Sequence, residues 1–340
     1  FHGNNRPGDS LSWDYYFVSK GHTRKSGRDR NLPKVSTGAG WFNWGPIDVP
    51  DDQMQDVRTV NWAKSELRKN HDKPFFLACG FYRPHLPWYV PKKYFDKFPL
   101  DEIILPEVKL DDLDDLPEYG KRFARERYSG SWGTDLNEGE RDHDLVIKYD
   151  QWKKGVQAYL ASIIFVDTYV GELLDGLDES KYADNTIVVL WGDHGWHLGE
   201  KQHWRKQALW EDTTHVPFII SYPKKIQKNI VCEHPVSFID MYPTLVDLAG
   251  IPKKEGLDGK SLKELLINPW MEWNRPVLST YGKGNHAVRS GKWRYIKYRD
   301  GSSELYDHQN DPNEWYNLSG KESFEKVVQN LKKIIPSTEK

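Results

Sequence analysis

Apolar residues recur along this chain with a helical period in three places. Between residues 56 and 69 they fall on one stripe (Val57, Val60, Ala63, Leu67), which predicts a helix with one buried face. The same spacing predicts a long helix over about residues 150–177 and a last helix over roughly 321–335. Residues 1–52 and 82–145 show no sustained period, so we expect long irregular segments there.

Three other short segments are almost entirely apolar. Residues 75–81, 186–191 and 218–222 have the composition of strands that are buried on both faces, as in a parallel sheet. Because these strands alternate with helices, the predicted fold class is α/β, with a mainly parallel central sheet flanked by helices.

The pattern changes after about residue 275. Short strands are predicted at residues 277–281, 287–289, 293–298 and 304–306, separated by tight turns. We therefore expect a main domain over residues 1–274 and a small C-terminal α+β subdomain over residues 275–340, built on an antiparallel sheet.

Composition narrows the possible partners of the 340-residue chain. The net charge is −2 with 29% charged residues, which gives no support to a nucleic-acid partner, since such proteins normally show a basic stripe. No run of about 18 apolar residues occurs, so no membrane span is expected, and no signal peptide is present. The 15 Trp often lie in polar loops. They suit either stacking on sugar rings or fastening of loops to the core.

The strongest chemical pattern follows the predicted strand at residues 186–191, which ends in Gly192-Asp193-His194-Gly195. In open α/β sheets, ligands bind at the carboxyl ends of the strands. A carboxylate and an imidazole at that edge suit a divalent cation or a phosphate or sulfate ester. Alternatively, Asp193 caps the next segment and His194 packs locally, and the tetrapeptide alone favours neither interpretation.

Two further segments place cationic side chains near the same edge. The predicted strand 75–81 leads to His85 between two prolines, which restrict the backbone and so fix the direction of the imidazole. Residues 201–206 form a basic and aromatic loop that ends in Lys206. Such side chains stabilise the charge of a tetrahedral anion and donate protons. A locally packed histidine and a solvated basic turn are the alternatives.

The segment from Gly192 to Pro217, together with residues 73–87, resembles the sulfatases of the alkaline-phosphatase superfamily. It looks most like the iduronate-2-sulfatase branch and its bacterial polysaccharide-sulfatase relatives. The sequence Glu304-Leu305-Tyr306-Asp307 is similar to a C-terminal signature of many sulfatases.

This resemblance implies an enzyme that hydrolyses sulfate esters on a sulfated carbohydrate. It implies that Asp193 and His194 bind one Ca²⁺ ion, that His85 contacts the sulfate, and that Lys206 lies beside the leaving group. The opening Phe1-His2 is similar to the end of a family motif, which makes His2 a further catalytic histidine.

One part of the family pattern is missing from the sequence. Sulfatases use a formylglycine nucleophile made from Cys or Ser in a Cys/Ser-x-Pro/Ala-x-Arg motif, and neither Cys79 nor Cys232 stands in one. We therefore expect the nucleophile and two further Asp ligands of calcium upstream of residue 1. The resemblance also implies a formylglycine-generating enzyme as maturation partner and a secreted or periplasmic location.

The resemblance leaves the sugar open, although 2-O-sulfated uronic acid is indicated. The candidate substrate-binding residues each carry either an imidazole ring or a guanidinium group: Arg83, His203, His215, His286 and Arg289. His203, His215, His286 and Arg289 each have an equally good structural interpretation. The rival functions are a phosphodiesterase or phosphonate monoester hydrolase of the same superfamily, and a catalytically inactive carbohydrate-binding relative that uses the aromatic loops.

Overall fold

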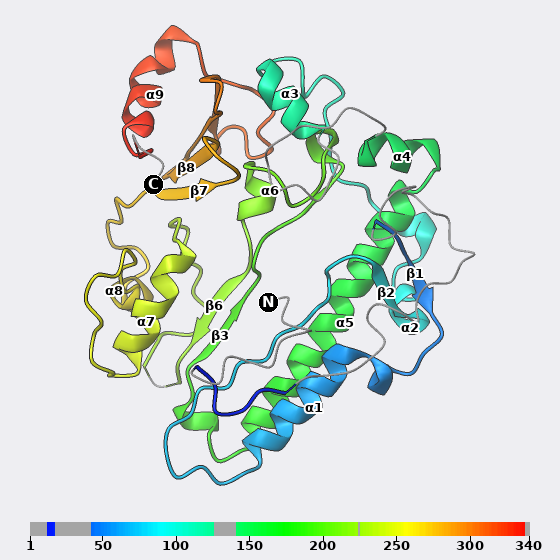
Figure 1. Cartoon of the computed structure of the whole chain (residues 1–340), viewed down its shortest axis with the longest axis vertical. Helices are drawn as coiled ribbons and strands as arrows, with labels where there is room; N and C mark the ends of the chain where they lie inside the picture. The colour runs from blue at the N-terminus through cyan, green and yellow to red at the C-terminus, as the bar shows by residue number, and fades with distance from the viewer. Residues whose placement is uncertain (1–11, 18–41, 126–140, 224, 337–340) are drawn as a thin grey trace. The chain divides into compact units, whose positions relative to one another are not determined.

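The computed structural model describes residues 12–17, 42–125, 141–223 and 225–336 (Figure 1). The chain divides into two compact units. The first unit contains residues 1–105 and 145–184, and the second contains residues 106–144 and 185–340. The C-terminal sheet shares the second unit with residues 185–274, so this division gives no boundary at residue 274, and the predicted subdomain stays a prediction.

Two helices form the frame of the first unit. Helix α1 (Gln55–Leu67) buries the predicted stripe of Val57, Val60, Ala63 and Leu67. It lies along α5 (Trp152–Asp178), the long helix that the sequence predicts (Figure 1). An ion pair of 2.6 Å between Lys64 Nζ and Glu172 Oε2 also joins the two helices. Both predicted helices are confirmed to within two residues at their C-terminal ends.

The first unit also contains a short parallel strand pair. Strands β1 (Trp44–Ile47) and β2 (Trp88–Pro91) pair with Trp44 opposite Trp88, and these buried rings stack with centroids 5.5 Å apart. The prediction of an irregular segment over residues 1–52 is therefore wrong at β1. Here the aromatic side chains fasten loops to the core, as one of the two interpretations predicted.

The apolar run at residues 75–81 is not a strand, so this prediction is wrong. Within the described residues it has no regular secondary structure, and Phe76 is 70% exposed. Phe75 packs edge-on against Tyr182 with ring centroids 5.0 Å apart. A strand forms only where a neighbour pairs with its backbone N–H and C=O groups, and no ladder in the described part of the unit includes this segment.

In the second unit, the predicted strands at 186–191 and 218–222 appear as β3 (Val188–Trp191) and β6 (Phe218–Ser221). They pair with each other, and the pairing is antiparallel, with Val188 opposite Ser221. The predicted complete burial is wrong, because Leu190 is 37% and Ile219 is 56% exposed. A two-stranded ribbon leaves its faces uncovered unless other elements pack on them.

The C-terminal antiparallel sheet is confirmed. Its strands, in the order β10-β9-β8-β7, are β7 (Val277–Thr280), β8 (His286–Ser290), β9 (Trp293–Lys297) and β10 (Ser303–Asp307). The predicted last helix appears as η6 (Glu322–Phe324) followed by α9 (Glu325–Lys332). Leu331 packs into a cluster with Val288 and Leu305, which fixes α9 on the sheet.

Short elements connect these parts. In the first unit they are η1 (Asp51–Gln53), α2 (Lys92–Phe95) and η2 (Leu100–Glu102). In the second they are α3 (Glu118–Ala124), β4 (His197–Leu198), η4 (Glu200–Gln202), β5 (Trp204–Arg205), α6 (Glu211–Thr214), η5 (Phe238–Asp240), α7 (Met241–Leu248) and α8 (Lys263–Ile267). Helix α4 (Asp142–Lys148) and η3 (Ala183–Asn185) each contain a point at which the sequence passes from one unit to the other. Residues 82–145, predicted to be irregular, therefore contain β2 and several short helices.

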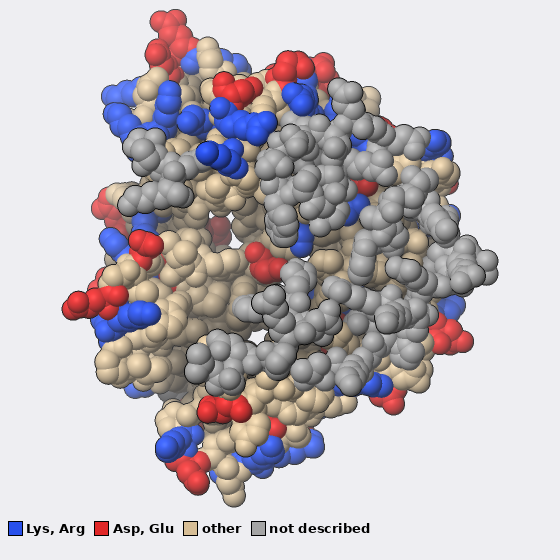
Figure 2. Space-filling model, in the orientation of Figure 1, with Lys and Arg blue, Asp and Glu red and all other residues tan. Residues whose placement is uncertain are grey.

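Acidic and basic side chains are interspersed on the described part of the face in Figure 2. None of the helices in the described ranges combines the length and apolar composition that a bilayer span requires.

Candidate functional site

A sharp turn follows β3 and carries Asp193 and His194. The backbone N–H of Gly195 donates to Thr213 O (2.7 Å), and that of Trp196 donates to Asp212 O (2.9 Å), so the turn is fastened to α6. A Cβ at Gly195 would lie 1.8 Å from the carbonyl oxygen of Asp212. Only glycine permits so close an approach of the two backbones, which explains its place directly after the histidine.

Three of the predicted site residues come together at this turn, and we call Asp193, His194 and Lys206 the strand-end site. Lys206 Nζ lies 2.9 Å from His194 Nε2, and Asp193 Oδ2 lies 3.4 Å from the same nitrogen. His194 Nδ1 is 2.9 Å from Gly195 O. Because a carbonyl only accepts, Nδ1 carries the proton of the neutral ring, and the Nε2 lone pair faces Lys206 and Asp193.

The charges at the strand-end site follow from partial burial. Burial lowers the pKa of His194, and the neighbouring Lys206 lowers it further, so the imidazole is neutral at pH 7. Burial also lowers the pKa of Lys206, although Asp193 opposes this shift. The Asp193 side chain is 80% exposed. A neutral imidazole and an accessible carboxylate are groups that bind metal ions.

The donors at this turn fit part of a calcium site. Ca²⁺ takes six to eight oxygen ligands, so Asp193 suits it well and the single imidazole nitrogen is the less usual donor. The two residues can hold one side of the ion, and further oxygen ligands are needed to complete the shell. The identity of the ion therefore stays a prediction.

His85 lies in the first unit, in the loop that precedes β2. Its Nδ1 lies 2.6 Å from Leu86 O, which makes Nδ1 the protonated nitrogen of the neutral ring. Its backbone N–H donates to Tyr82 O, so the loop holds the ring in a defined direction. His2 lies outside the described residues. The catalytic roles of both histidines stay predictions.

Arg83 is buried beneath the His85 loop. Its Nε and Nη2 donate to Tyr89 O at 3.1 and 3.0 Å, and its charge faces the buried Asp56. Asp56 in turn accepts from the backbone N–H groups of Tyr82 and Arg83. This geometry favours a bracing role for Arg83 over substrate contact, which stays an untested prediction.

The other four predicted substrate-binding residues differ in exposure. His203 is buried, its Nδ1 contacts Ala124 O at 2.8 Å, and burial lowers its pKa to about 4. His286 is buried beside Thr280 Oγ1, and Arg289 donates to Glu211 and to Gly291 O. His215 is exposed at the end of α6. Of the four, His215 has the geometry that best permits contact with a ligand.

A buried group of charges escaped the sequence analysis, and we call Glu211, Arg294, Glu314 and His308 the buried ion network. Arg294 donates to Glu211 through Nη2. Its Nε lies 2.9 Å from Glu314 Oε1, which makes an ion pair without the geometry of a hydrogen bond. His308 Nε2 lies 2.8 Å from Glu314 Oε1. Burial alone would raise the pKa of Glu211, but Arg294 and Arg289 lower it to about 2. Distant segments supply these residues, so no local pattern could reveal them.

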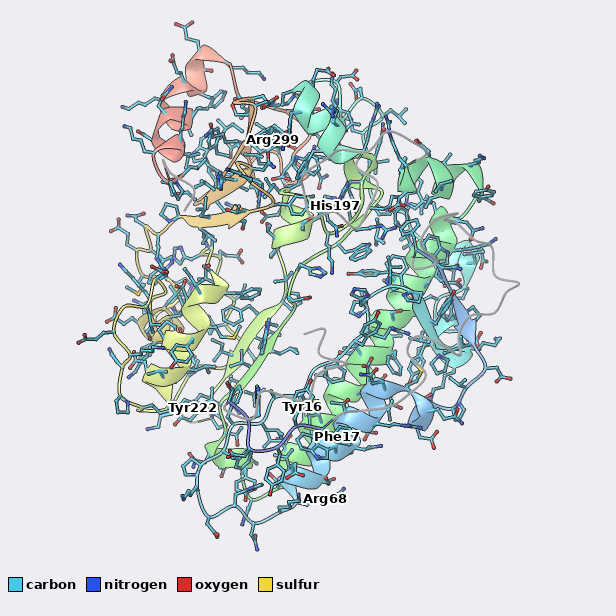
Figure 3. The ribbon with its side chains drawn as sticks, in the orientation of Figure 1. Tyr16, Phe17, Arg68, His197, Tyr222 and Arg299 are labelled. Atoms are coloured by element: carbon cyan, nitrogen blue, oxygen red, sulfur yellow. The ribbon has the colours of Figure 1, made fainter. Side chains whose placement is uncertain are left out.

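A second group that the sequence analysis did not assign consists of His197, Glu200 and Asp212. Figure 3 shows His197 close to α6, and the three side chains offer ligand atoms within 4.8 Å of one another. The spacing of His197 and Glu200, three residues apart just after the strand-end turn, was the available signal.

Solved structures with similar folds support the α/β class. The phosphonate monoester hydrolase SpPMH from Silicibacter pomeroyi superposes with a TM-score of 0.71 at 20% identity, over 85% of this chain and 60% of that chain. A protein solved in complex with its substrate D-glucosamine-2-N,6-O-disulfate gives a TM-score of 0.65 at 22% identity, over 82% of this chain and 68% of that chain. These likenesses confirm an α/β fold that is shared by sulfatases and phosphonate hydrolases.

Sequence comparison then identifies the family. A model described as Sulfatase matches residues 8–251, and one described as N-sulphoglucosamine sulphohydrolase, C-terminal, matches residues 199–340. The chain therefore belongs to the sulfatase family, as the motifs around Asp193 and His85 indicated.

Two curated relatives show how much of the family's length is present. A sulfatase of Formosa agariphila is 38% identical over 332 residues, which cover 98% of this chain and 61% of that protein. Human iduronate 2-sulfatase is 30% identical over 239 residues, which cover 60% of this chain and 42% of that protein. The chain thus spans about three fifths or less of the length of these relatives.

Proposed function

We propose that the protein containing this chain hydrolyses sulfate esters on a sulfated sugar. The observation that carries the proposal is the strand-end site, where a carboxylate, a neutral imidazole and an ammonium group converge in a chain of the sulfatase family. A cation site beside an ammonium group suits a substrate with a tetrahedral anionic group that must be held and then released.

Each residue of the strand-end site has a role in this proposal. Asp193 and His194 would hold a Ca²⁺ ion, which when bound neutralises charge on the sulfate oxygens. Lys206 would donate a proton to the departing sugar oxygen, and its lowered pKa favours that transfer. His85 would contact the sulfate or supply the same proton, and His2 would act when the sulfate is released.

The proposed nucleophile is a formylglycine that lies outside these 340 residues. Neither Cys79 nor Cys232 stands in the modification motif, and the relatives are longer than this chain. The proposal therefore includes two further Asp ligands in the same additional segment and maturation by a formylglycine-generating enzyme.

The proposed substrate class is a sulfated polysaccharide or its fragments, with 2-O-sulfated uronic acid as the first candidate. Similarity to iduronate 2-sulfatase supports the uronic acid, and the likeness to the protein solved with a sulfated glucosamine supports a sulfated sugar in general. His215 is the predicted substrate-binding residue whose exposure best supports such a role. A polymeric substrate does not cross membranes, which supports a secreted or periplasmic location.

A phosphonate monoester hydrolase or phosphodiesterase is the second candidate, because the fold likeness to SpPMH has the higher TM-score, 0.71 against 0.65. A catalytically inactive carbohydrate-binding protein is the third. Trp270, which is 70% exposed, is the described tryptophan that best supports sugar stacking.

The test is the release of inorganic sulfate from 2-O-sulfated uronic acid disaccharides by the complete protein, compared with hydrolysis of an aryl sulfate and an aryl phosphodiester. We expect calcium-dependent sulfate release that exceeds phosphodiester hydrolysis. Asp193→Asn should lower kcat/KM by about 10²-fold or more, because one charged ligand of the ion is lost.

Asp114→Asn is the matched control, since it makes the same change at an exposed aspartate of the second unit. Faster hydrolysis of the phosphodiester would support the second candidate. Normal turnover and calcium affinity of Asp193→Asn would contradict the proposed role of the strand-end site.

A further inference from the structure

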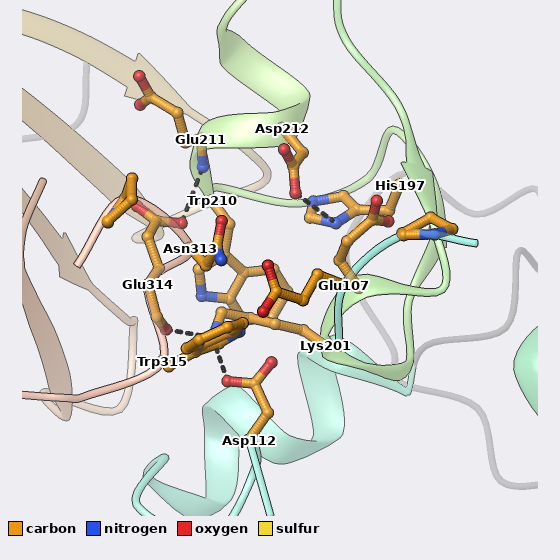
Figure 4. A pocket seen from close by; sticks show the side chains of 13 residues that line it. Glu107, Asp112, His197, Lys201, Trp210, Glu211, Asp212, Asn313, Glu314 and Trp315 are labelled. Atoms are coloured by element: carbon orange, nitrogen blue, oxygen red, sulfur yellow. Dashed lines mark hydrogen bonds and ion pairs between the residues drawn. The ribbon is translucent and has the colours of Figure 1, made fainter. Parts of the chain in front are cut away.

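A group of potential metal ligands lies beside a cavity in the second unit, apart from the strand-end site. His197 in β4, Glu200 in η4 and Asp212 in α6 place one ligand atom each within 4.8 Å of the others. All three line a cavity of about 160 Å³, which also receives Glu107 and Trp210 (Figure 4). The cavity is large enough for a hydrated ion.

His197 is the unusual member of this group. The side chain is fully buried, yet neither ring nitrogen has a hydrogen-bond partner among the described residues. The nearest charged atom is Asp212 Oδ2, 3.6 Å from Nδ1, and Figure 4 shows that carboxylate directed at the ring. Burying a polar group without a partner is unfavourable. The buried imidazole of His197 therefore has ring nitrogens that can still bind a ligand.

The packing around His197 explains why the ring cannot turn toward another partner. It makes edge-to-face contacts with His203 and Trp210, at centroid distances of 5.1 and 5.9 Å. Burial lowers the pKa of His197, and the neighbouring His203 and Lys201 lower it further. The imidazole is therefore neutral, which is the form that binds metal ions.

The pKa values of Glu200 and Asp212 are both raised, because burial and neighbouring carboxylates disfavour their charged forms. Burial, and then Asp212, raises the pKa of Glu200 to about 7. Burial, and then Glu314 and Glu211, raises the pKa of Asp212 to about 6. Lys201 lines the same cavity, but its ammonium group is 2.9 Å from Asp112 Oδ1 and so is engaged elsewhere. A bound cation would stabilise both carboxylates in their charged form.

We propose that His197, Glu200 and Asp212 bind a divalent transition-metal ion such as Zn²⁺, at a structural site separate from the strand-end site. One imidazole nitrogen and two carboxylate oxygens suit zinc or manganese better than calcium, which prefers oxygen ligands alone. At tetrahedral angles, ligands about 2.0–2.2 Å from zinc lie roughly 3.3–3.6 Å apart. The distance of 3.6 Å between His197 Nδ1 and Asp212 Oδ2 already fits this spacing, and the other ligand atoms, which lie within 4.8 Å of one another, would move closer by about 1 Å, with water as a further ligand.

The ion would join β4, η4 and α6, which flank the segment that carries Lys206. It would therefore hold in place the loop between residues 197 and 212 without contacting the substrate. The other acidic group with a histidine, Glu211, Glu314 and His308, carries no such proposal, because Arg294 already occupies its carboxylates.

Zinc binding to the purified, chelator-treated protein tests the proposal by isothermal titration calorimetry. We expect one Zn²⁺ ion per chain at this site, and binding at least about tenfold weaker in Glu200→Gln and in Asp212→Asn. At pH 6 binding should also release protons, since both carboxyl groups must be deprotonated. Titration in buffers of different ionisation enthalpy measures that release, which Glu200→Gln should reduce.

Two matched variants separate this site from other sources of zinc affinity. Glu107→Gln removes a charge from the same cavity without changing a ligand, and Asp193→Asn changes the strand-end site instead. Both should retain the zinc affinity to within about threefold, whereas the ligand variants should not. Absence of zinc binding, or equal weakening in all four variants while circular dichroism shows them folded, would overturn the proposal. None of these measurements depends on sulfatase activity.

Discussion

The second unit contains two polar regions that use charge in opposite ways. In the buried ion network, Arg294 lies against both Glu211 and Glu314, and His308 completes the arrangement. In the strand-end site, Lys206 contacts a neutral imidazole, and the carboxylate of Asp193 extends into solvent. The first region satisfies its charges internally, and the second leaves binding capacity for a ligand.

This difference separates residues that hold the fold from residues that are available for chemistry. Removing one partner from a buried ion pair leaves an uncompensated charge, which destabilises a protein strongly. A partly exposed ammonium or carboxylate remains solvated when its neighbour is removed, so the cost in stability is small. The comparison therefore predicts large stability effects in the network and small ones at the strand-end site.

The largest effect is expected for Arg294→Ala. The substitution leaves Glu211 and Glu314 without their shared cation, and it removes the hydrogen bond of 2.8 Å to Leu209 O. The free energy of unfolding should fall by about 3–5 kcal/mol, as measured by urea denaturation. Arg299→Ala is the control, because Arg299 is an exposed arginine close to the same sheet (Figure 3), and it should cost less than about 1 kcal/mol. Equal losses in the two variants would contradict the distinction.

A smaller effect is expected for Glu211→Gln, and it should depend on pH. The pKa of Glu211 is about 2 in the folded protein and 4.5 ordinarily, so the folded state binds its proton more weakly than the unfolded state. Its stabilisation is therefore complete above about pH 4.5 and is lost as the pH falls toward 2. The variant should lose roughly 2–3 kcal/mol at pH 7 and show a flatter decline below pH 4.5. Unfolding curves at several pH values measure this, and parallel curves for the two proteins would refute it.

The smallest effect on stability is expected for Lys206→Met. Lys206 is partly exposed and contacts a neutral ring, so the free energy of unfolding should change by less than about 1 kcal/mol. The pKa of His194 should rise, because Lys206 contributes to its lowering. NMR titration of the His194 ring measures this shift, and Lys263→Met, at the partly exposed pair with Asp247, is the control. An unchanged His194 pKa would show that the two side chains do not meet in solution.

The parts that the sequence predicted correctly are those whose pattern is local. The helices α1 and α5 and the four strands of the C-terminal sheet follow directly from apolar spacing and turn residues. The turn that carries Asp193 and His194 was recognisable from a strand that ends in glycines, and Lys206 follows it closely in the chain. In each case, residues close together in the sequence determine both the secondary-structure element and the position where it ends.

The parts that the sequence predicted wrongly depend on distant partners. Residues 75–81 have strand composition but no paired neighbour in the described ranges, and β3 pairs with β6 in the antiparallel sense. Apolar composition favours burial without specifying which strand lies alongside or in which direction. Residue type likewise gave no information about which of the five candidate substrate-binding residues are exposed, and their roles stay predictions.

The sequence by itself therefore determined the sulfatase family, the main helices, the C-terminal sheet and the position of the Asp193-His194 turn, since contiguous residues encode each of them. Only the tertiary structure decided that Lys206 meets His194, that Arg83 and His203 are buried, and that His197, Glu200 and Asp212 converge. Such contacts depend on how separate segments pack, and packing sets burial, pKa and pairing at once.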